Sequence, residues 1–222
     1  MNSIIAALDV PERARTLELA RLLAPEVGMV KLGLESFVAH GPDLVREVRA
    51  LGVDVFLDLK LHDIPRTAAA AAREAAKLDV RLLTIHASGG AEMISACREA
   101  VGVELTIVAV TVLTSLADDD VRDVGFSDAT TGLTERLGKL AMSNGAHGLV
   151  CSAHDLSALA SAGGIRVVPG IRPAAHANHD QKRVATPGEA RAAGATWLVV
   201  GRPIVDARDP VAAARAIAAE VQ

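Results

Sequence analysis

VFLDLKLHDIPRT, residues 55–67, joins an apolar strand to the start of a helix and carries charged side chains near the junction. Successive residues of a strand point to opposite faces, so Asp58 and Lys60 share one face while the aliphatic residues beside them occupy the other. Asp63 follows in the connecting turn, and Pro65 stands where a helix can begin without losing a hydrogen bond. Charges in such an apolar run must be paired or must take part in function.

The same unit, a short apolar run followed by a helical pattern, recurs along the whole chain. The runs that predict strands are 4–9, 28–32, 54–60, 81–87, 105–111, 147–152, 165–170 and 197–201. The segments with three- and four-residue apolar spacing, which predict helices, are 12–23, 36–51, 66–77, 91–100, 131–144, 154–162, 187–193 and 210–221. Eight such units predict an α/β fold of the closed (β/α)8 TIM barrel type. A doubly wound open sheet is the alternative, because periodicity does not reveal closure.

No linker or shift in composition divides the chain, so we expect one domain over residues 1–222. Two segments break the regular alternation. Residues 115–128 predict a long loop or a short helix, and residues 171–183 are polar with no strong helical pattern. Long connections on such a scaffold are usually functional loops, so we expect residues 171–183 to act as a lid.

The composition indicates a globular protein that binds neither nucleic acid nor membranes. The 222 residues are 50% apolar and 23% charged, with a formal net charge of −4 and 2% aromatic residues. There is no basic run with interleaved aromatic residues, and no apolar run has the roughly 20 residues that span a bilayer. The first ten residues, MNSIIAALDV, do not have the pattern of a secretion signal, which favours a cytoplasmic location. Cys97 and Cys151 lack metal-type spacing and are typical of core positions.

Polar residues gather at the carboxyl ends of the predicted strands, which form the active face of a barrel. They are Asp9, Lys31, Asp58, Lys60, Asp63, His86, Thr111, Thr114, Arg172 and Arg202. A buried ion-pair network would explain the charges on the first three strands, but burying several ions contributes little stability. An array of alternating sign is better explained as electrostatics directed at a reacting substrate.

The last two strands end in glycine and arginine. VVPGIRP (167–173) places Gly170 and VVGRPI (199–204) places Gly201 and Arg202 where barrels often bind a phosphate group. The guanidinium group suits a phosphate dianion. We therefore expect a small phosphorylated substrate. His176 and His179, in a loop without further ligands, do not predict a metal site.

The segment DLKLHDIPRT (58–67) resembles the DxKxxD signature of the orotidine 5'-phosphate decarboxylase family in its bacterial form. The resemblance covers the whole chain. It includes ALDV (7–10), VKLG (30–33), AVTVLTS (109–115), VVPGIRP (167–173), DQKR (180–183) and VVGRPI (199–204). One departure is Arg66, where many members have asparagine; it lies outside the charged array.

The resemblance implies cofactor-independent decarboxylation of orotidine 5'-phosphate to UMP, the last step of de novo pyrimidine nucleotide synthesis. The implied catalytic residues are Lys60 as proton donor, Asp58 beside the departing carboxylate, Lys31 and Asp63. The implied substrate-binding residues are Asp9, Lys31, Asp58, Thr67, Thr114, Ser115, Arg172, Gln181, Gly201 and Arg202. The resemblance also implies a homodimer in which Asp63 and Thr67 complete the partner's site, and no metal or other cofactor.

Two alternatives differ in chemistry. Metal-dependent relatives with the same DxKxxD strand, of the keto-gulonate phosphate decarboxylase or hexulose phosphate synthase type, carry a glutamate for magnesium at the end of the second strand. Position 31 is a lysine here, a cation where a metal needs an anion. A catalytically silent barrel that only binds a phosphorylated nucleotide would be expected to lack Lys60 or Asp63, and both are present.

Overall fold

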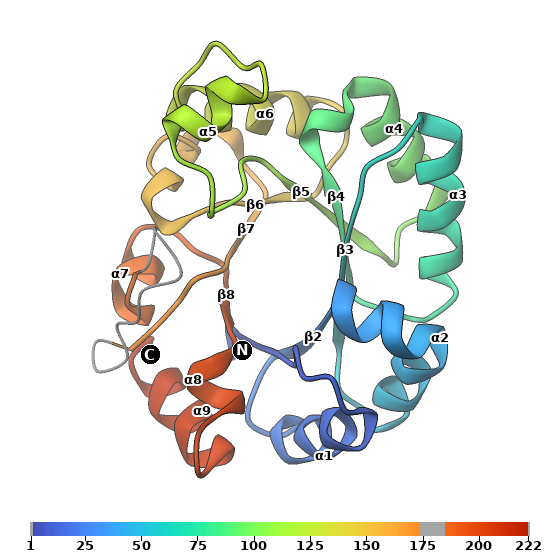
Figure 1. Cartoon of the computed structure of the whole chain (residues 1–222), viewed down its shortest axis with the longest axis vertical. Coiled ribbons are helices and arrows are strands. Elements are labelled where there is room, and N and C mark those ends of the chain that lie inside the picture. Colours follow the sequence, from blue (N-terminus) through green and yellow to red (C-terminus); the bar gives the residue numbers. More distant parts are fainter. Residues whose placement is uncertain (1, 174–184, 222) are drawn as a thin grey trace.

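The computed structural model describes residues 2–173 and 185–221, which form a barrel of parallel strands in chain order (Figure 1). The strands are β1 (Ile4–Ala7), β2 (Met29–Gly33), β3 (Val55–Leu61), β4 (Leu82–His86), β5 (Thr106–Val110), β6 (Gly148–Val150), β7 (Ile165–Val168) and β8 (Trp197–Val200). β8 pairs in parallel with β1, with Ile5 opposite Val199, and this pairing closes the barrel. The predicted (β/α)8 TIM barrel is confirmed, and the open sheet is excluded.

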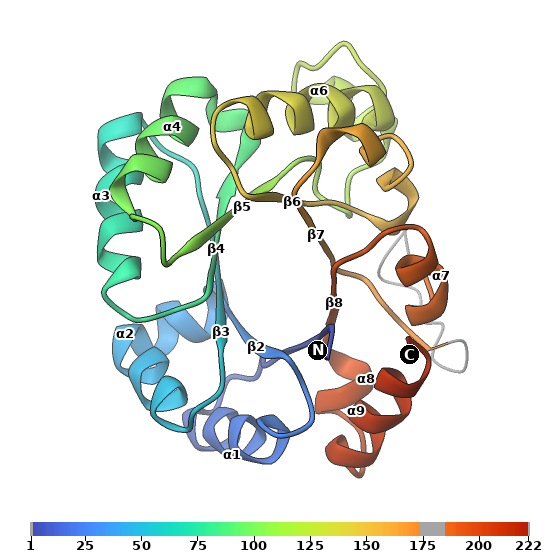
Figure 2. The ribbon, with the colours of Figure 1, turned by 180° about the vertical axis from the view of Figure 1, so that it is seen from behind.

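Helices surround the barrel on its outside in both views (Figures 1 and 2). They are α1 (Arg13–Leu23), α2 (Leu34–Ala50), α3 (Pro65–Ala76), α4 (Ala91–Ala100), α5 (Asp118–Asp123), α6 (Thr130–Ser143), α7 (Pro187–Ala192), α8 (Arg202–Val205) and α9 (Pro210–Ala219). Pro65, Pro187 and Pro210 each open a helix, as predicted. Within the described ranges, no helix is both long enough and apolar enough to cross a membrane.

The alternation of side chains along the strands separates two apolar cores. Ile5, Met29, Phe56 and Trp197 belong to the smaller core, inside the barrel. Their neighbours along the strands point outward and pack under the helices in the larger core. The barrel interior is thus filled with side chains below the carboxyl ends of the strands, which leaves that end for a site.

Several element boundaries differ from those predicted. α2 begins two residues earlier than predicted. It is interrupted at Gly41, just before Pro42, because the φ of Gly41 is 64°, which is not a helical value. The segment 115–128 contains the short α5, one of the two outcomes expected for it. α8, directly after β8, was not predicted, because four residues are too few to show a helical period.

The prediction of a helix over 154–162 is wrong. This stretch forms two short 3₁₀ turns, Ala153–Asp155 and Ala160–Ala162, joined by further turns. The buried guanidinium group of Arg166 donates to the backbone carbonyls of Leu159, at 2.7 Å, and of Gly163. The backbone hydrogen bonds of this stretch are mostly of the i→i+3 type, such as those from Leu156 N–H to Ala153 and from Ala162 N–H to Leu159, so the apolar spacing does not lead to a continuous α-helix.

Candidate active site

Four charged side chains form a row at the carboxyl ends of β1, β2 and β3, and their signs alternate. Lys31 Nζ donates to both carboxylate oxygens of Asp9, at 2.8 and 2.9 Å, and lies 3.6 Å from Asp58 Oδ2. Lys60 Nζ donates to both oxygens of Asp58, at 2.8 Å each. We refer to Asp9, Lys31, Asp58 and Lys60 as the charged row.

The middle of the charged row is buried. Lys31 and Asp58 are each 8% exposed, whereas Asp9 lies at the exposed end. Two carboxylates and two ammonium groups balance one another, and each buried group has an oppositely charged partner. Lys31 contacts both Asp9 and Asp58, and Asp58 contacts both Lys31 and Lys60, so loss of either end of the row leaves the buried centre paired.

The carboxyl group of Asp58 remains ionised despite its burial. Burial raises its pKa, but the charges of Lys31 and Lys60, together with hydrogen bonds from Lys60 and Thr84, lower it by more, so the net pKa lies below the ordinary value. The row therefore presents a negative charge at Asp58 near neutral pH, and the Lys60 ammonium group lies directly beside it. Such preorganised charges can stabilise charge that develops in a reacting ligand.

Gly33, at the end of β2, leaves room for the first pair of the row. A Cβ atom at this position would lie 2.7 Å from Asp9 Oδ1 and 2.9 Å from Lys31 Nζ. Both distances are too short for a carbon atom beside these groups. Its φ of −91° is open to any residue, so the requirement for glycine here comes from space and not from backbone conformation.

Lys60 has a backbone conformation that is rare for a residue with a side chain. Its φ is 51°, in the left-handed region. The register between β3 and β4 shifts at the same place, because Leu57 pairs with Leu83 but the next pair is Leu61 with Ile85. A bulge therefore inserts extra residues into β3 around Lys60, and such irregularities are common beside active sites. A strained conformation of this kind costs about 1–3 kcal/mol and persists only where the surroundings hold it.

Two histidines stack next to the row. The rings of His62 and His86 lie 5.3 Å apart, centroid to centroid, with 28° between their planes. Burial, and then the nearby His62 and Lys60, lower the pKa of His86. The imidazole of His86 is therefore neutral near neutral pH and adds no charge to the row.

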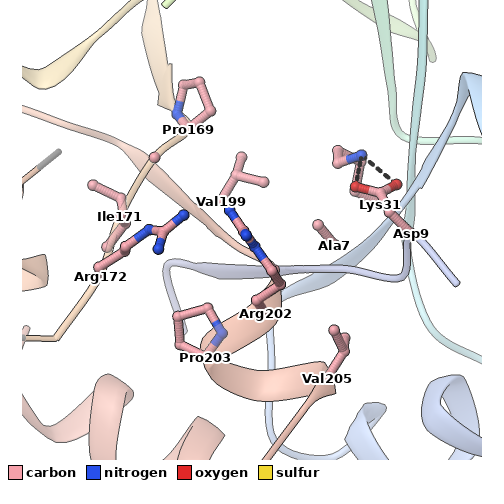
Figure 3. A pocket seen from close by; sticks show the side chains of 12 residues that line it. Ala7, Asp9, Lys31, Pro169, Ile171, Arg172, Val199, Arg202, Pro203 and Val205 are labelled. Atoms are coloured by element: carbon pink, nitrogen blue, oxygen red, sulfur yellow. Dashed lines mark hydrogen bonds and ion pairs between the residues drawn. The ribbon is translucent and has the colours of Figure 1, made fainter. Parts of the chain in front are cut away.

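A cavity of about 380 Å³ opens between the ends of β7, β8 and β1. Arg172 and Arg202 extend their guanidinium groups into it and toward each other, while Lys31 and Asp9 lie on its other side (Figure 3). Gly170, with a φ of 75°, and Gly201 contribute backbone to its wall. Two guanidinium groups and exposed backbone make this cavity suited to a phosphate group.

A second, smaller cavity of about 160 Å³ lies next to the first, and Lys31, Pro169 and Val199 line both. Asp58 and Lys60 form its charged side. The rest of its lining is mainly apolar and includes Val110, Val112, Leu113, Val150 and Cys151, together with Thr114. A ligand that spans both cavities would place an anionic group at the arginines and a ring against the charged row.

The sequence profile of the orotidine 5'-phosphate decarboxylase / HUMPS family matches residues 2–217. The chain belongs to this family. It is 53% identical to an orotidine 5'-phosphate decarboxylase of Anaeromyxobacter sp. (strain K), over 97% of this chain and 96% of that protein. It is 50% identical to the enzyme of that name from Gluconobacter oxydans (strain 621H), over 98% and 96% of the two chains. The crystal structure of the orotidine 5'-phosphate decarboxylase from Lactobacillus acidophilus is 35% identical and covers 100% of both chains with a TM-score of 0.88.

Membership of the orotidine 5'-phosphate decarboxylase / HUMPS family agrees with the resemblance seen in the sequence. Of the residues predicted for the site, the structure brings a group together around the two adjoining cavities: Asp9, Lys31, Asp58, Lys60, Thr114, Arg172, Gly201 and Arg202. Asp63, Thr67 and Ser115 are exposed and line neither cavity. Gln181 and residues 174–183 of the expected lid lie outside the described residues.

Sequence reasoning did not identify Gly33, Thr84 or the apolar wall of the second cavity as parts of the site. Gly33 stands in the VKLG segment, but only the distances to Asp9 and Lys31 show why glycine is needed there. Thr84 interrupts an apolar strand with a hydroxyl group, a signal that could have been used. The wall residues Val112 and Val150 look like ordinary core residues in the sequence.

The donor groups at the end of β2 do not suit a divalent cation. In the described part of the chain there is no cluster of three or more histidine, cysteine or carboxylate residues that could hold a metal ion. The two carboxylates that could contribute, Asp9 and Asp58, have the ammonium group of Lys31 between them. A cation bound there would have to displace another cation.

Proposed function

We propose that this protein is a carboxy-lyase that decarboxylates orotidine 5'-phosphate to UMP, the last step of de novo pyrimidine nucleotide synthesis. One observation carries the proposal. The charged row lies against a small cavity that adjoins a second cavity with two arginines. This arrangement fits a ligand with a reacting ring at one end and a phosphate at the other, and it agrees with the names of the relatives.

The phosphate would bind between Arg172 and Arg202, with the backbone at Gly201 beside it. Packing among the described residues does not demand glycine at 201, because the only one of them that a Cβ atom there would meet is Ala7, at 3.7 Å. Space for a close ligand gives a reason for glycine at this position. Asp9 and Lys31, on the far side of the same cavity, are suited to hold ribose hydroxyl groups. Thr114 lines the second cavity, where the pyrimidine ring would sit.

The chemistry follows from the charges of Asp58 and Lys60. The bond between C6 and the carboxylate breaks, CO2 leaves, and the electron pair stays on C6, where the ring cannot delocalise it. The Lys60 ammonium group would stabilise that pair and then transfer a proton to C6, which yields UMP. Asp58 keeps the ammonium group beside C6, and its negative charge opposes the substrate carboxylate. In this proposal, lysine and aspartate side chains supply the stabilisation that a cofactor would otherwise provide.

Binding of the phosphate would contribute to the rate as well as to affinity. The arginine cavity is separate from the charged row, so its interactions can hold the substrate in the geometry needed for reaction. We expect Gln181 and the segment 171–183 to close over the phosphate as part of this process. The backbone N–H of Arg172 donates to the carbonyl of Ala185 at 3.0 Å, so described residues at the start of that segment and just after it lie next to each other.

The metal-dependent alternative, a sugar-phosphate decarboxylase or aldolase of the same superfamily, is not favoured. It needs an anionic ligand at the end of β2, and the residue there is Lys31, which is already paired with Asp9. Lys60 and Asp63 are both present, which disfavours a silent binding protein.

We further propose that two copies of the chain form a homodimer in the cytoplasm and that Asp63 and Thr67 of each complete the other's site. Both residues are exposed on the turn into α3 and on its first helical turn. Large apolar residues nearby are also exposed, namely Ile64 at 62%, Leu34 at 50% and Val38 at 81%. Exposed apolar residues on the side of the charged strands support a partner at this surface.

The direct test of the function is a decarboxylation assay on protein treated exhaustively with EDTA. We expect orotidine 5'-phosphate to be converted to UMP at the same rate with and without added Mg²⁺, and sugar phosphates with a carboxylate to be inert. A strict requirement for Mg²⁺, or turnover of a sugar phosphate in place of the nucleotide, would contradict the proposal.

A further inference from the structure

Thr84 lies in the middle of β4, fully buried, directly opposite the bulge in β3. In the register between these strands, Leu83 faces Leu57 and Ile85 faces Leu61. Thr84 is therefore the single residue of β4 opposite the three residues 58–60 of β3. It lines neither of the two cavities, so any effect on a ligand must pass through the residues that it contacts.

The hydroxyl group of Thr84 connects the two residues on either side of the bulge. Thr84 Oγ1 accepts a hydrogen bond from the backbone N–H of Lys60 at 2.8 Å and donates one to Asp58 Oδ1 at 2.9 Å. A hydroxyl group has one hydrogen to donate and lone pairs to accept with, and both capacities are used here. The same carboxylate oxygen, Asp58 Oδ1, also accepts from Lys60 Nζ at 2.8 Å.

These contacts account for two unusual features of β3 at once. The bulge removes the regular ladder partner of the Lys60 amide, and the Thr84 hydroxyl replaces it. The left-handed φ of 51° at Lys60 is disfavoured for a residue with a side chain and needs a specific contact to hold it. On the other side of the bulge, the donated hydrogen bond orients the carboxylate that receives the Lys60 ammonium group.

We propose that Thr84 is a positioning residue for the decarboxylation. Its hydroxyl group holds the backbone of Lys60 and the carboxylate of Asp58 in the relative placement that directs the ammonium group at the substrate. This inference rests on the function proposed above. The methyl group of Thr84 has no part in it, so a serine at this position keeps the contact and a valine of the same shape removes it.

The test compares Thr84→Val with Thr84→Ser and with Thr134→Val as a matched control. Thr134, in α6, is also fully buried, but its hydroxyl group has no hydrogen-bond partner among the described residues. We expect Thr84→Val to lower kcat for orotidine 5'-phosphate by about 10- to 100-fold, the factor for one hydrogen bond to a charged group. The KM should change by no more than about twofold, because the substitution leaves the contacts to the phosphate intact.

Thr84→Ser should recover most of the wild-type kcat, and Thr134→Val should match the wild type. If Thr84→Val does not fold, Thr84→Ala, which also lacks the hydroxyl group, replaces it in the comparison. A wild-type kcat in Thr84→Val, an equal loss in Thr84→Ser, or a loss that appears only in KM would overturn the proposal.

A crystal structure of Thr84→Val tests the same contact without any assay of activity. We expect the φ of Lys60 to leave the left-handed region, or the ammonium group of Lys60 to move off Asp58. An unchanged φ and an unchanged contact would show that Thr84 does not hold this geometry. A wild-type enzyme that is inactive on orotidine 5'-phosphate would instead contradict the proposed function, so the two failures can be told apart.

Discussion

Lys31 Nζ lies between two carboxylates, 2.8 Å from Asp9 Oδ1 and 3.6 Å from Asp58 Oδ2, at the point where the two cavities meet. This one ammonium group joins the exposed start of the charged row to its buried centre. It also occupies the place where a divalent cation would otherwise find two acidic ligands. Because Lys31 at the end of β2 fills that place, the site is suited to chemistry that uses ammonium and carboxylate groups and not a metal ion.

Lys60→Ala should lower kcat by about 10²- to 10⁴-fold, the usual contribution of a positioned acid or base. The substitution removes both the proton donor and the charge beside C6, and it leaves Asp58 with Lys31 as its remaining cationic partner. The loss of absorbance as the orotate group is consumed measures the rate, and circular dichroism checks the fold. Lys77→Ala is the matched control, because Lys77 is exposed and pairs with Glu74 on the surface. Activity of Lys60→Ala near that of the control would exclude the acid role.

Arg202→Ala should weaken binding by about 10- to 100-fold, because one charge-assisted contact to the phosphate is lost. Calorimetric titration with UMP measures the affinity directly. Arg208→Ala, which removes an exposed arginine a few residues further along the chain, should bind UMP like the wild type. If Arg202→Ala also bound UMP like the wild type, Arg202 would have no part in the phosphate site.

Gly33→Ala should reduce kcat/KM by about 10- to 100-fold, although the change adds a single methyl group. The new Cβ atom would overlap the ammonium group of Lys31 and the carboxylate of Asp9, so the first pair of the row must shift. Gly132→Ala is the control, because a Cβ atom at Gly132 would meet only Asp128, at 3.6 Å. Equal activity of the two variants would mean that the charged row tolerates displacement.

The stability of the fold should fall as the pH falls below about 6.5, and His147 should account for part of the change. His147 Nδ1 accepts a hydrogen bond from the Ile107 backbone N–H at 2.9 Å, which requires an unprotonated nitrogen. Burial, and then the charge of Arg98, lower the pKa of His147 in the folded state. The unfolded chain therefore binds more protons below pH 6.5. This contribution to stability is present above that pH and is lost as the pH falls through the pKa of the folded state.

Urea unfolding at several pH values, followed by the fluorescence of the single tryptophan, Trp197, measures this effect. His147→Gln keeps a hydrogen-bond acceptor but does not titrate, so its free energy of unfolding should depend less steeply on pH than that of the wild type. The same dependence in both proteins would show that His147 does not contribute.

Mixing two inactive variants should restore activity if Asp63 completes the partner's site. A dimer of one Lys60→Ala protomer and one Asp63→Ala protomer contains one site with both residues and one with neither. Random exchange at equal concentration should therefore give about a quarter of the wild-type activity. A mixture that stays as inactive as its components would place Asp63 in the site of its own protomer.

The sequence alone predicted the barrel and most of the polar residues that gather around the two cavities, because both depend on repeating or local patterns. Eight apolar runs separated by helical spacing indicated β1 to β8, and charges at the ends of those runs indicated the charged row. The alternation of faces correctly placed Asp58 and Lys60 on one side of β3 and Leu57 on the other.

The features that the sequence did not predict depend on contacts between distant segments. Over 154–162, short 3₁₀ turns replace the expected helix, and Arg166, on β7, donates to the Leu159 carbonyl within them. The left-handed backbone at Lys60 depends on a hydroxyl group from the neighbouring strand, and the need for glycine at 33 depends on two side chains from β1 and β2. None of these contacts produces a periodic pattern of residues in the sequence.

Whether the charged row takes the place of a cofactor is tested most directly by a crystal structure of the protein with UMP bound in the presence of Mg²⁺. We expect the phosphate to lie between Arg172 and Arg202, and Lys60 Nζ to face C6 of the ring while it remains in contact with Asp58. A magnesium ion between Asp9 and Asp58, or an ammonium group of Lys60 directed away from the ring, would contradict this expectation.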